Sequence, residues 1–510
     1  MNLFGHRWIS ILVLNAALAG ILVGHFPIHA QDLSRQSLSQ HIKYLASDDL
    51  KGRGNGTPEL DQAAQYIAER FLEAGLVGPY EGEYFQEFDV PTGFSIGPEN
   101  MVTFFELPSQ PLHLRFGEDY HPVSYQEGSL PLAAPLVFLG FGISAPELGY
   151  DDYAGQSVEG KILLVYEHEP QEHSLTSVFD GNRLSAYSDL EHKAREARER
   201  GALGLVLLPD TFNHYREPGN LPRAELANLG LNVIRLSDSW ARRLMEAAGE
   251  DVRQILRSIN RDLTPYSFRM RSIQAVVRID VTVIRKRVKN VVGILPGDSH
   301  SAVVIGAHYD HLGLGGLYSL APDAIDQVHN GADDNASGVA GLLELSRWFA
   351  QHRPRHTQVF IAFAGEELGL LGSTHYTNSP AVSLQDTVAM LNMDMIGRSF
   401  GELLVGGVGT AREFRSVLEA AEEQSNLRFR FAETPRASSD HMPFSRRQIP
   451  VLFFFSGLHA DYHRPGDDWE RIELDRALEV VRVVRNCLQS LDEIGSSLSF
   501  VDLDRRDPGN

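Results

Sequence analysis

The sequence predicts an α/β protein with a mixed, mainly parallel central sheet that is flanked by helices. Two observations support this fold class. Between about residues 302 and 455, short apolar runs alternate with helical stretches, as in a parallel sheet covered on both faces. Between about residues 131 and 264, a strand-rich segment interrupts the chain. Because 510 residues are too many for one compact core, we predict two domains, with one inserted into the other.

The first segment, residues 1–30, is predicted to be a signal peptide. His6 and Arg7 precede an apolar stretch that runs to Gly24, and the segment ends in a small residue, Ala30, where cleavage is expected. The stretch is short and interrupted, whereas a membrane span needs about 20 apolar residues. We therefore expect an exported protein, periplasmic or extracellular, that has no membrane attachment after cleavage.

The rest of the chain is predicted to form a main domain in two parts, an insertion and a tail. The main domain comprises residues 31–130 and 265–495, the insertion 131–264, and the C-terminal tail 496–510. Apolar residues at three- and four-residue steps predict helices between Leu33 and Leu76. Further elements are expected as strands at 84–116, 136–142, 160–166, 202–208, 232–237, 275–283 and 290–295, and as helices at 189–200, 239–249, 338–352 and 411–425.

Composition excludes some classes of partner. The formal net charge of −21 disfavours binding to nucleic acid and to anionic membranes. The single cysteine, Cys487, excludes an intramolecular disulfide, and its apolar neighbours place it on the buried face of a C-terminal helix. An exported chain without disulfides must depend for its stability on core burial, to which a bound metal ion can add.

Groups that can bind a metal ion recur at the ends of four predicted strands. The ligands of α/β proteins gather at the carboxyl ends of strands, so these groups are expected to meet. The strands and the groups that follow them are 303–305 with His308 and Asp310, 358–363 with Glu366 and Glu367, 388–393 with Asp394, and 451–455 with Tyr462 and His463.

Two adjacent divalent ions need a carboxylate that bridges them, and zinc accepts His, Asp and Glu. We assign Asp334 as the bridge; the terminal ligands are His308 and Asp394 on one ion, and Glu367 and His463 on the other. Glu366 is then free to act as the general base that takes a proton from the water between the ions. Asp310 is expected to orient the ring of His308, and Tyr462 to donate a hydrogen bond to the oxyanion.

Other residues near these motifs are given lesser roles. His311, His329 and His441 exceed the ligand count, and we expect them to support ligands or the structure. Ser439 and Asp440 are expected at the rim of the pocket. The Gly-rich loop 48–58 is interpreted as a connection between helices and has no predicted role in catalysis. The insertion has no metal-ligand spacing, so it is expected to shape access or bind a partner.

Several motifs together resemble those of the M28 family of co-catalytic zinc aminopeptidases. They are Ala307-His308-Tyr309-Asp310, Gly331 to Gly338, Gly365-Glu366-Glu367, Asn392 to Gly397, Ser439 to Phe444 and Tyr462 to Pro465. The resemblance implies the phosphorylase/hydrolase-like zinc exopeptidase fold, two zinc ions per chain and peptide substrates. It selects Asp334 over Asp333 as the bridge and implies a cis peptide bond after it. The insertion resembles a protease-associated domain.

We therefore expect a secreted two-zinc aminopeptidase. Three alternatives remain open. A carboxypeptidase or dipeptidase could use the same metal centre, a glutaminyl cyclase could use a similar scaffold with one zinc, and a non-catalytic binding protein could use the insertion for recognition. A Ser-His-Asp hydrolase is disfavoured because no Gly-x-Ser-x-Gly elbow follows a strand.

Overall fold

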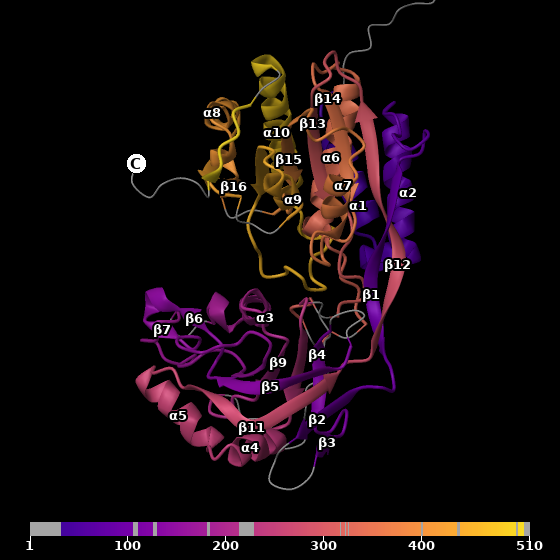
Figure 1. The fold of residues 1–510 in the computed structure, drawn as a ribbon. Coiled ribbons are helices and arrows are strands. Elements are labelled where there is room, and N and C mark those ends of the chain that lie inside the picture. The colour runs from indigo at the N-terminus through magenta and orange to yellow at the C-terminus, as the bar shows by residue number, and fades with distance from the viewer. Residues whose placement is uncertain are drawn as a thin grey trace, which may run out of the picture.

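The computed structural model describes residues 32–503 except 106–110, 126–129, 181–183, 214–228, 317, 322, 325, 399–400, 436–438 and 496–497. Within these residues the chain forms two bodies, each built on an eight-stranded sheet (Figure 1). The predicted signal peptide lies outside the described residues. None of the described helices combines the length and the apolar character that crossing a membrane requires.

The sheet of the first body has the order β1-β12-β14-β13-β15-β18-β16-β17. Its four central strands, from β14 to β18, are parallel to one another, while β1, β12 and β16 pair antiparallel to a neighbour. The mixed, mainly parallel sheet is therefore confirmed. The strands are β1 (Phe85–Ile96), β12 (Val281–Leu295), β13 (Ala302–His308), β14 (Thr357–Phe363), β15 (Thr387–Met393), β16 (Glu402–Gly406), β17 (Arg428–Phe431) and β18 (Val451–Phe455).

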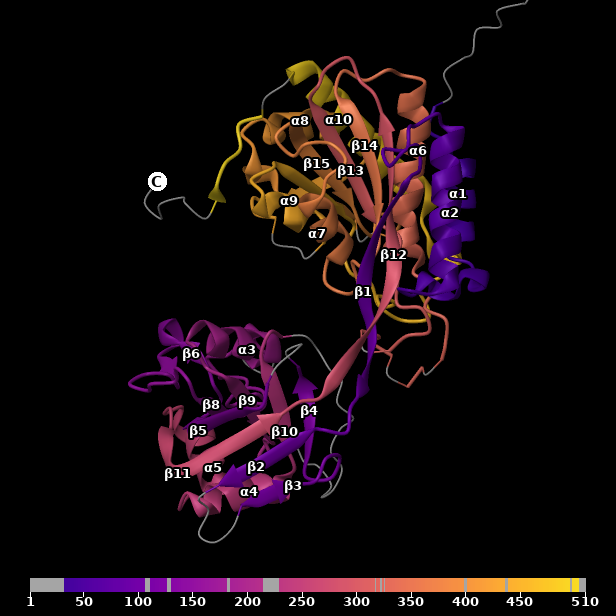
Figure 2. The same cartoon turned by 45° about the vertical axis from the view of Figure 1, so that its right-hand side comes forward.

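Helices cover both faces of this sheet (Figure 2). One face packs against α1 (Arg35–Leu45), α2 (Pro58–Glu73), α6 (Gly338–Ala350), α8 (Phe414–Glu423) and α10 (Leu474–Ile494). The opposite face packs against α7 (Leu371–Asn378) and α9 (His441–Arg446), through Tyr376 and Phe444. The central strands are buried from end to end because both faces are covered, which explains their continuous apolar sequences.

Local sequence signals account for the helices at the start of the body. Ser34 caps α1, where its hydroxyl accepts the N–H of Ser37, and Thr57 caps α2 in the same way. Pro58 occupies the first position of α2, where no N–H is required. The predicted helices between Leu33 and Leu76 are thus confirmed.

The second body contains the sheet β3-β2-β11-β5-β8-β9-β10-β4. Its helix α3 covers one face, and α4 and α5 cover the other. The helices are α3 (Leu190–Glu199), α4 (Asp238–Ala247) and α5 (Val252–Asp262); the strands are β2 (Met101–Phe105), β3 (Leu112–Leu114), β4 (Tyr120–Ser124), β5 (Leu132–Leu139), β8 (Ile162–Tyr166), β9 (Gly204–Leu208), β10 (Asn232–Leu236) and β11 (Ser267–Arg278). A two-stranded ladder of β6 (Ser144–Ala145) and β7 (Tyr150–Asp151) lies beside it.

This sheet takes strands from both sides of the segment 131–264 that was predicted to be the insertion. β2, β3 and β4 precede that segment, and β11 follows it. The pairing of Met101 with Arg278 joins residues that are far apart in the sequence, so no local pattern indicates it. The helix α5 was not predicted, nor were the short helices α7 and α9.

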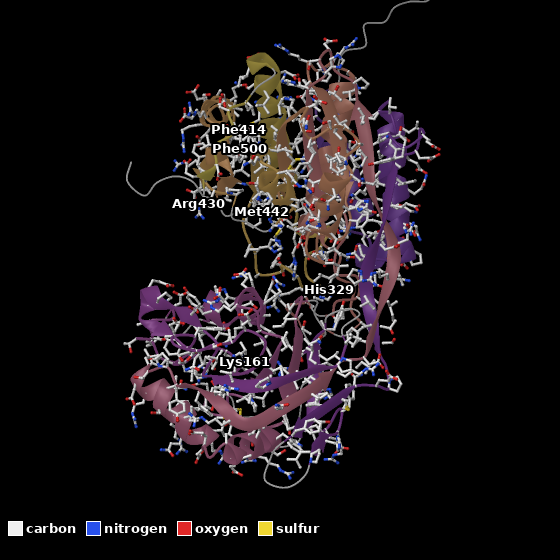
Figure 3. The ribbon with its side chains drawn as sticks, viewed as in Figure 1. Lys161, His329, Phe414, Arg430, Met442 and Phe500 are labelled. Atoms are coloured by element: carbon white, nitrogen blue, oxygen red, sulfur yellow. The ribbon has the colours of Figure 1, made fainter. Side chains whose placement is uncertain are left out.

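The long antiparallel pair β1 and β12 leads from the first body to the second (Figures 1 and 2). β12 runs away from the second body and pairs antiparallel with β14, so the carboxyl ends of β13, β14, β15 and β18 point toward the second body. Figure 3 labels His329 among the loops at that edge, with Lys161 in the second body beyond it.

Candidate metal centre

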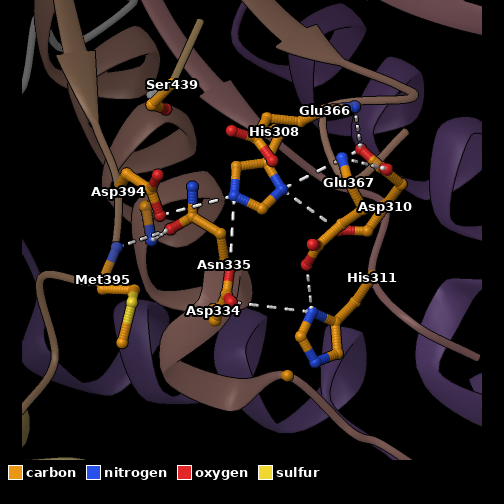
Figure 4. A network of polar contacts seen from close by, with 12 residues as sticks. His308, Asp310, His311, Asp334, Asn335, Glu366, Glu367, Asp394, Met395 and Ser439 are labelled. Carbon is orange, nitrogen blue, oxygen red and sulfur yellow. Dashed lines mark hydrogen bonds and ion pairs between the residues drawn. The ribbon is translucent and has the colours of Figure 1, made fainter. Parts of the chain in front are cut away.

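The predicted ligands meet at the carboxyl edge of the first sheet, and Figure 4 labels four of them, His308, Asp334, Glu367 and Asp394. His308 is the last residue of β13, Glu367 follows β14, and Asp394 follows β15. His463 lies in the loop after β18. Asp334 lies in the irregular turn η4 (Ala332–Ser337) that leads into α6. Five predicted ligands from five segments therefore converge at the edge that the strand order indicates.

The carboxylate of Asp334 lies between two imidazoles. Its Oδ1 is 3.3 Å from Nε2 of His308, and its Oδ2 is 3.2 Å from Nε2 of His463. On the outer sides, His308 Nε2 is 3.3 Å from Asp394 Oδ1, and His463 Nε2 is 3.2 Å from Glu367 Oε2. Asp334 thus has the central position assigned to a bridge, and each imidazole has one further carboxylate. The peptide bond between Asp334 and Asn335 is cis, as the resemblance implied.

Two sets of these side chains bring their ligand atoms within 4.8 Å of one another. One comprises His308, Asp334 and Glu367, and the other His308, Glu366 and Asp394. The second set includes Glu366, the predicted base, and places its carboxylate beside the ligand pair His308 and Asp394. These are the two metal-capable groups found among the described residues.

Asp310 is fully buried and holds the neighbouring loop. The backbone N–H groups of Glu366 and Glu367 donate to its two carboxylate oxygens at 3.2 and 3.3 Å. Nδ1 of His308 lies 3.2 Å from the backbone carbonyl of Asp310 but 3.8 Å from its carboxylate. The nearest acceptor for the ring of His308 is therefore the carbonyl, while the carboxylate of Asp310 positions the loop that carries Glu366 and Glu367.

The charges in this cluster shift one another's pKa values. Burial lowers the pKa of His463, but hydrogen bonds with Asp334 and Glu367 outweigh it and raise that pKa to about 10. Burial also opposes the protonation of His308, yet the carboxylates of Glu366 and Asp394 raise its pKa well above the usual value. Burial raises the pKa of Glu366 well above the usual range, and Glu367 adds to this effect. Burial thus favours the neutral form of such a carboxyl group, whereas a neighbouring positive charge favours its ionised form.

Tyr462 stacks on the ring of the predicted ligand His463, with ring centroids 3.9 Å apart. Burial raises the pKa of the Tyr462 phenol, and the carboxylates of Asp334 and Glu367 raise it further. Its hydroxyl therefore stays protonated and can donate a hydrogen bond.

The five residues that were given lesser roles differ in their surroundings. Nδ1 of His311 lies 2.7 Å from Glu367 Oε1, so this histidine supports a ligand. His329 Nε2 lies 2.8 Å from the hydroxyl of Ser319. The ring of His441 stacks on Phe453, with centroids 4.5 Å apart. Ser439 accepts a hydrogen bond from the amide of Asn392 at 2.9 Å, and both Ser439 and Asp440 are buried.

Sequence reasoning missed two groups that hold the site. Asp467 accepts the N–H of Asp333 and the N–H of Asp334, each at 3.0 Å. Nε2 of His459 lies 3.3 Å from Asp333 Oδ2, behind the bridge. The loop 48–58, for which no catalytic role was predicted, also contacts the site through Arg53 and Asn55. No spacing pattern indicates these contacts because most of them go to backbone groups.

The family comparison matches this arrangement. Residues 290–488 match the family model described as Peptidase family M28. This part of the chain belongs to peptidase family M28. The matched range contains all five predicted metal ligands, Glu366 and Tyr462.

Curated relatives of this chain are similar over parts of their length. A probable zinc metalloprotease from Phaeosphaeria nodorum is 38% identical over 123 residues, which are 22% of this chain and 25% of the relative. A probable leucine aminopeptidase from Arthroderma otae is 28% identical over 203 residues, which are 38% of this chain and 54% of the relative. The chain thus spans between a quarter and about half of the length of these relatives.

Solved structures are similar over most of the chain. An aminopeptidase from Aneurinibacillus sp. strain AM-1 has 20% identity and a TM-score of 0.53, covering 92% of this chain and 95% of that one. A zinc aminopeptidase from Bacillus subtilis has 21% identity and a TM-score of 0.51, covering 90% and 96%. At this level of identity the likeness establishes the fold.

Proposed function

We propose that this M28 chain is an exported aminopeptidase that binds two zinc ions and removes N-terminal residues from peptides. The observation that supports it best is the position of Asp334 between His308 and His463, each of which faces one further carboxylate. Relatives named as zinc metalloprotease and leucine aminopeptidase, and a fold neighbour named as a zinc aminopeptidase, favour the same activity.

The residues present fit zinc. Imidazole nitrogens and carboxylate oxygens are the ligands that zinc accepts, and two sets of three lie within 4.8 Å. Asp334, Asp394 and Glu367 bring buried carboxylates together, which costs free energy unless cations neutralise them. We assign His308 and Asp394 to one ion, Glu367 and His463 to the other, and Asp334 to both. When bound, zinc supplies a Lewis acid that polarises the scissile carbonyl and lowers the pKa of water.

The chain's own residues account for the proton transfers. Glu366 lies beside His308 and Asp394 without being one of the five ligands, so it can take a proton from the attacking water. Once it is protonated, Glu366 can donate the same proton to the leaving amine. The hydroxyl of Tyr462, held against His463, is the donor that would stabilise the oxyanion.

An amino end fits this site better than a carboxyl end. The site presents carboxylates, which attract the ammonium group of a free N-terminus. Arg398 and Arg471 follow strands that border the site, but both pair with Asp461, at 2.6 and 2.8 Å. One carboxylate neutralises only one of the two guanidinium groups, so the pair keeps one net positive charge. The carboxypeptidase alternative is therefore distinguished by the peptide panel described below.

The role of the second body and the export of the chain belong to the same proposal. We infer that the segment 131–264 is the central part of a protease-associated domain that limits access to the site. The position of the second body opposite the carboxyl edge of the first sheet supports this role (Figure 1). The apolar stretch that ends at Gly24 favours export.

The test combines metal analysis with a peptide panel. We expect two zinc ions per chain, cleavage of peptides with a free N-terminus, and resistance of the same peptides after N-terminal acetylation. Equal cleavage of acetylated peptides would exclude an aminopeptidase. One ion per chain with cyclisation of N-terminal glutamine would favour the glutaminyl cyclase alternative.

A further inference from the structure

The loop between α1 and α2 packs directly on the backbone of the ligand loops. Gly52 has a φ of +67°, and a Cβ there would lie 2.2 Å from the carbonyl oxygen of His329 and 2.6 Å from that of Gly313. The N–H of Gly313 donates to Gly52 at 3.1 Å, and the N–H of His311 donates to Arg53 at 3.3 Å. Only glycine at position 52 allows this approach.

Arg53 projects from this loop into the interior. It is 1% exposed and has a φ of +50°, a conformation that persists only where surrounding contacts hold it. Its guanidinium donates to the carbonyls of Tyr309 at 2.8 Å, Asn330 at 2.7 Å and Gly331 at 3.0 Å, and also to Leu45. Tyr309 follows the ligand His308, and Gly331 precedes η4, which carries Asp334. One planar side chain thus connects the segments that carry two ligands.

Asn55 connects the same loop to a third segment. Its side-chain amide donates to Asp310 Oδ2 at 2.7 Å. The carboxylate of Asp310 accepts the N–H groups of Glu366 and Glu367. Asn55 therefore orients the buried carboxylate that holds both the predicted base and a predicted ligand.

We propose that Arg53 and Asn55 are positioning residues, which hold the loops after β13 and β14 and the turn before α6 in the geometry that two divalent cations require. The proposal rests on the metal centre of the proposed function. Its physical basis is pre-organisation, because ligands that are already held in place lose little conformational freedom when a cation binds.

Substitutions of Asn55 can distinguish a positioning role from a purely structural one. The Asn55 side chain donates to Asp310, whereas Arg53 also donates to the carbonyl of Leu45 in α1. Removing Arg53 would leave four carbonyls without their donor, so Arg53→Met could prevent folding. The decisive variants are therefore Asn55→Ala, which removes the donor, and Asn55→Asp, which has the same shape but places an acceptor against the carboxylate of Asp310.

The experiment measures zinc affinity of the full mature chain by competition with a chelator, together with kcat, KM and the midpoint of thermal unfolding without metal. For Asn55→Ala we expect a dissociation constant about 10- to 100-fold higher than in the wild type. Its kcat should fall by a similar factor while KM changes about twofold or less. Asn55→Asp should bind zinc more weakly than Asn55→Ala, and Arg53→Lys should also weaken binding because lysine lacks the planar fork.

The matched control is Asn260→Ala in the second body. Asn260 is buried, and its side chain accepts the N–H of Gln171 and donates to the carbonyl of Leu256, away from the site. This variant should lose stability yet keep wild-type zinc affinity. Wild-type affinity in both Asn55 variants would overturn the proposal. If Asn55→Ala does not fold, the isosteric Asn55→Asp decides. If the wild-type chain binds no zinc, the proposed function fails instead, and the two failures are thereby distinguished.

Discussion

The carboxylate of Asp467 accepts the backbone N–H of Asp334 at 3.0 Å. The same carboxylate accepts the N–H of Asp333 at 3.0 Å, so it fixes the peptide that leads into the predicted bridging ligand. Asp467 follows β18 by twelve residues in sequence and lies in the same loop as His463. The loop that carries the predicted ligand His463 therefore also holds the segment that carries the predicted bridge, Asp334.

Asp467→Asn should weaken metal binding. Asparagine keeps one acceptor oxygen but loses the charge and the second acceptor, so Asp334 should be held less firmly. We expect a rise of about tenfold or more in the zinc dissociation constant, measured by chelator competition. Asp492→Asn is the control, because Asp492 likewise accepts two consecutive N–H groups, those of Arg355 and His356. These residues directly precede β14, at the end of that strand away from the site. Equal effects of both substitutions would contradict a specific role for Asp467.

Glu366→Gln should separate catalysis from metal binding. Glutamine has nearly the same shape but cannot accept a proton from water, so kcat should fall by a factor of about 10²–10⁴. Zinc content, measured by metal analysis, should stay at the wild-type value because Glu366 is not one of the five assigned ligands. Glu479→Gln on α10 serves as the control and should leave kcat unchanged. Turnover above about a tenth of the wild-type rate would rule out Glu366 as the base.

Tyr462→Phe should remove the oxyanion donor and little else. Phenylalanine can keep the stacking on His463, which has a centroid distance of 3.9 Å. We expect kcat to fall by a factor of about 10²–10³, with zinc content unchanged. The control is Tyr266→Phe, which removes an exposed hydroxyl in the second body that donates to Glu250. A change confined to KM would show that Tyr462 binds the substrate and does not stabilise the transition state.

His41 should make folding stability depend on pH. Burial lowers its pKa to about 4 in the folded chain, where Nδ1 lies 2.7 Å from the hydroxyl of Tyr66. Between pH 6.5 and 4 the unfolded chain therefore binds the proton more readily than the folded chain does. This contribution is fully present above pH 6.5 and is lost as the pH falls toward 4, by up to about 3 kcal/mol.

Urea unfolding at several pH values checks this expectation. The free energy of unfolding of the wild type should fall between pH 6.5 and 4 more steeply than that of His41→Gln, which keeps a hydrogen-bonding side chain but does not titrate. Parallel pH dependences in the two proteins would show that other groups control acid stability. Both proteins should be compared at equal metal occupancy, since zinc affinity is itself pH-dependent.

The main features of the first body could be predicted because their signals are local. A parallel strand that is buried on both faces is a continuous apolar run, and its carboxyl end lies at a known edge of the sheet. His308, Glu367 and Asp394 each follow such an apolar run, so the sequence predicts that they lie at one site. The short helices α7 and α9 could not be recognised in this way, since a few residues carry too little periodicity.

The sequence by itself indicated the α/β fold, the buried parallel strands of the first sheet and the edge of that sheet where the five predicted ligands meet. Only the tertiary structure decided which strands complete the second sheet, and which distant residues hold the ligands in place. β2 and β11 pair through backbone hydrogen bonds that any side chain permits. Arg53, Asn55 and Asp467 act on backbone groups or on one buried carboxylate, across loops separated by more than 100 residues. Such contacts depend on where the folded chain brings its loops together, which no local pattern of residues specifies.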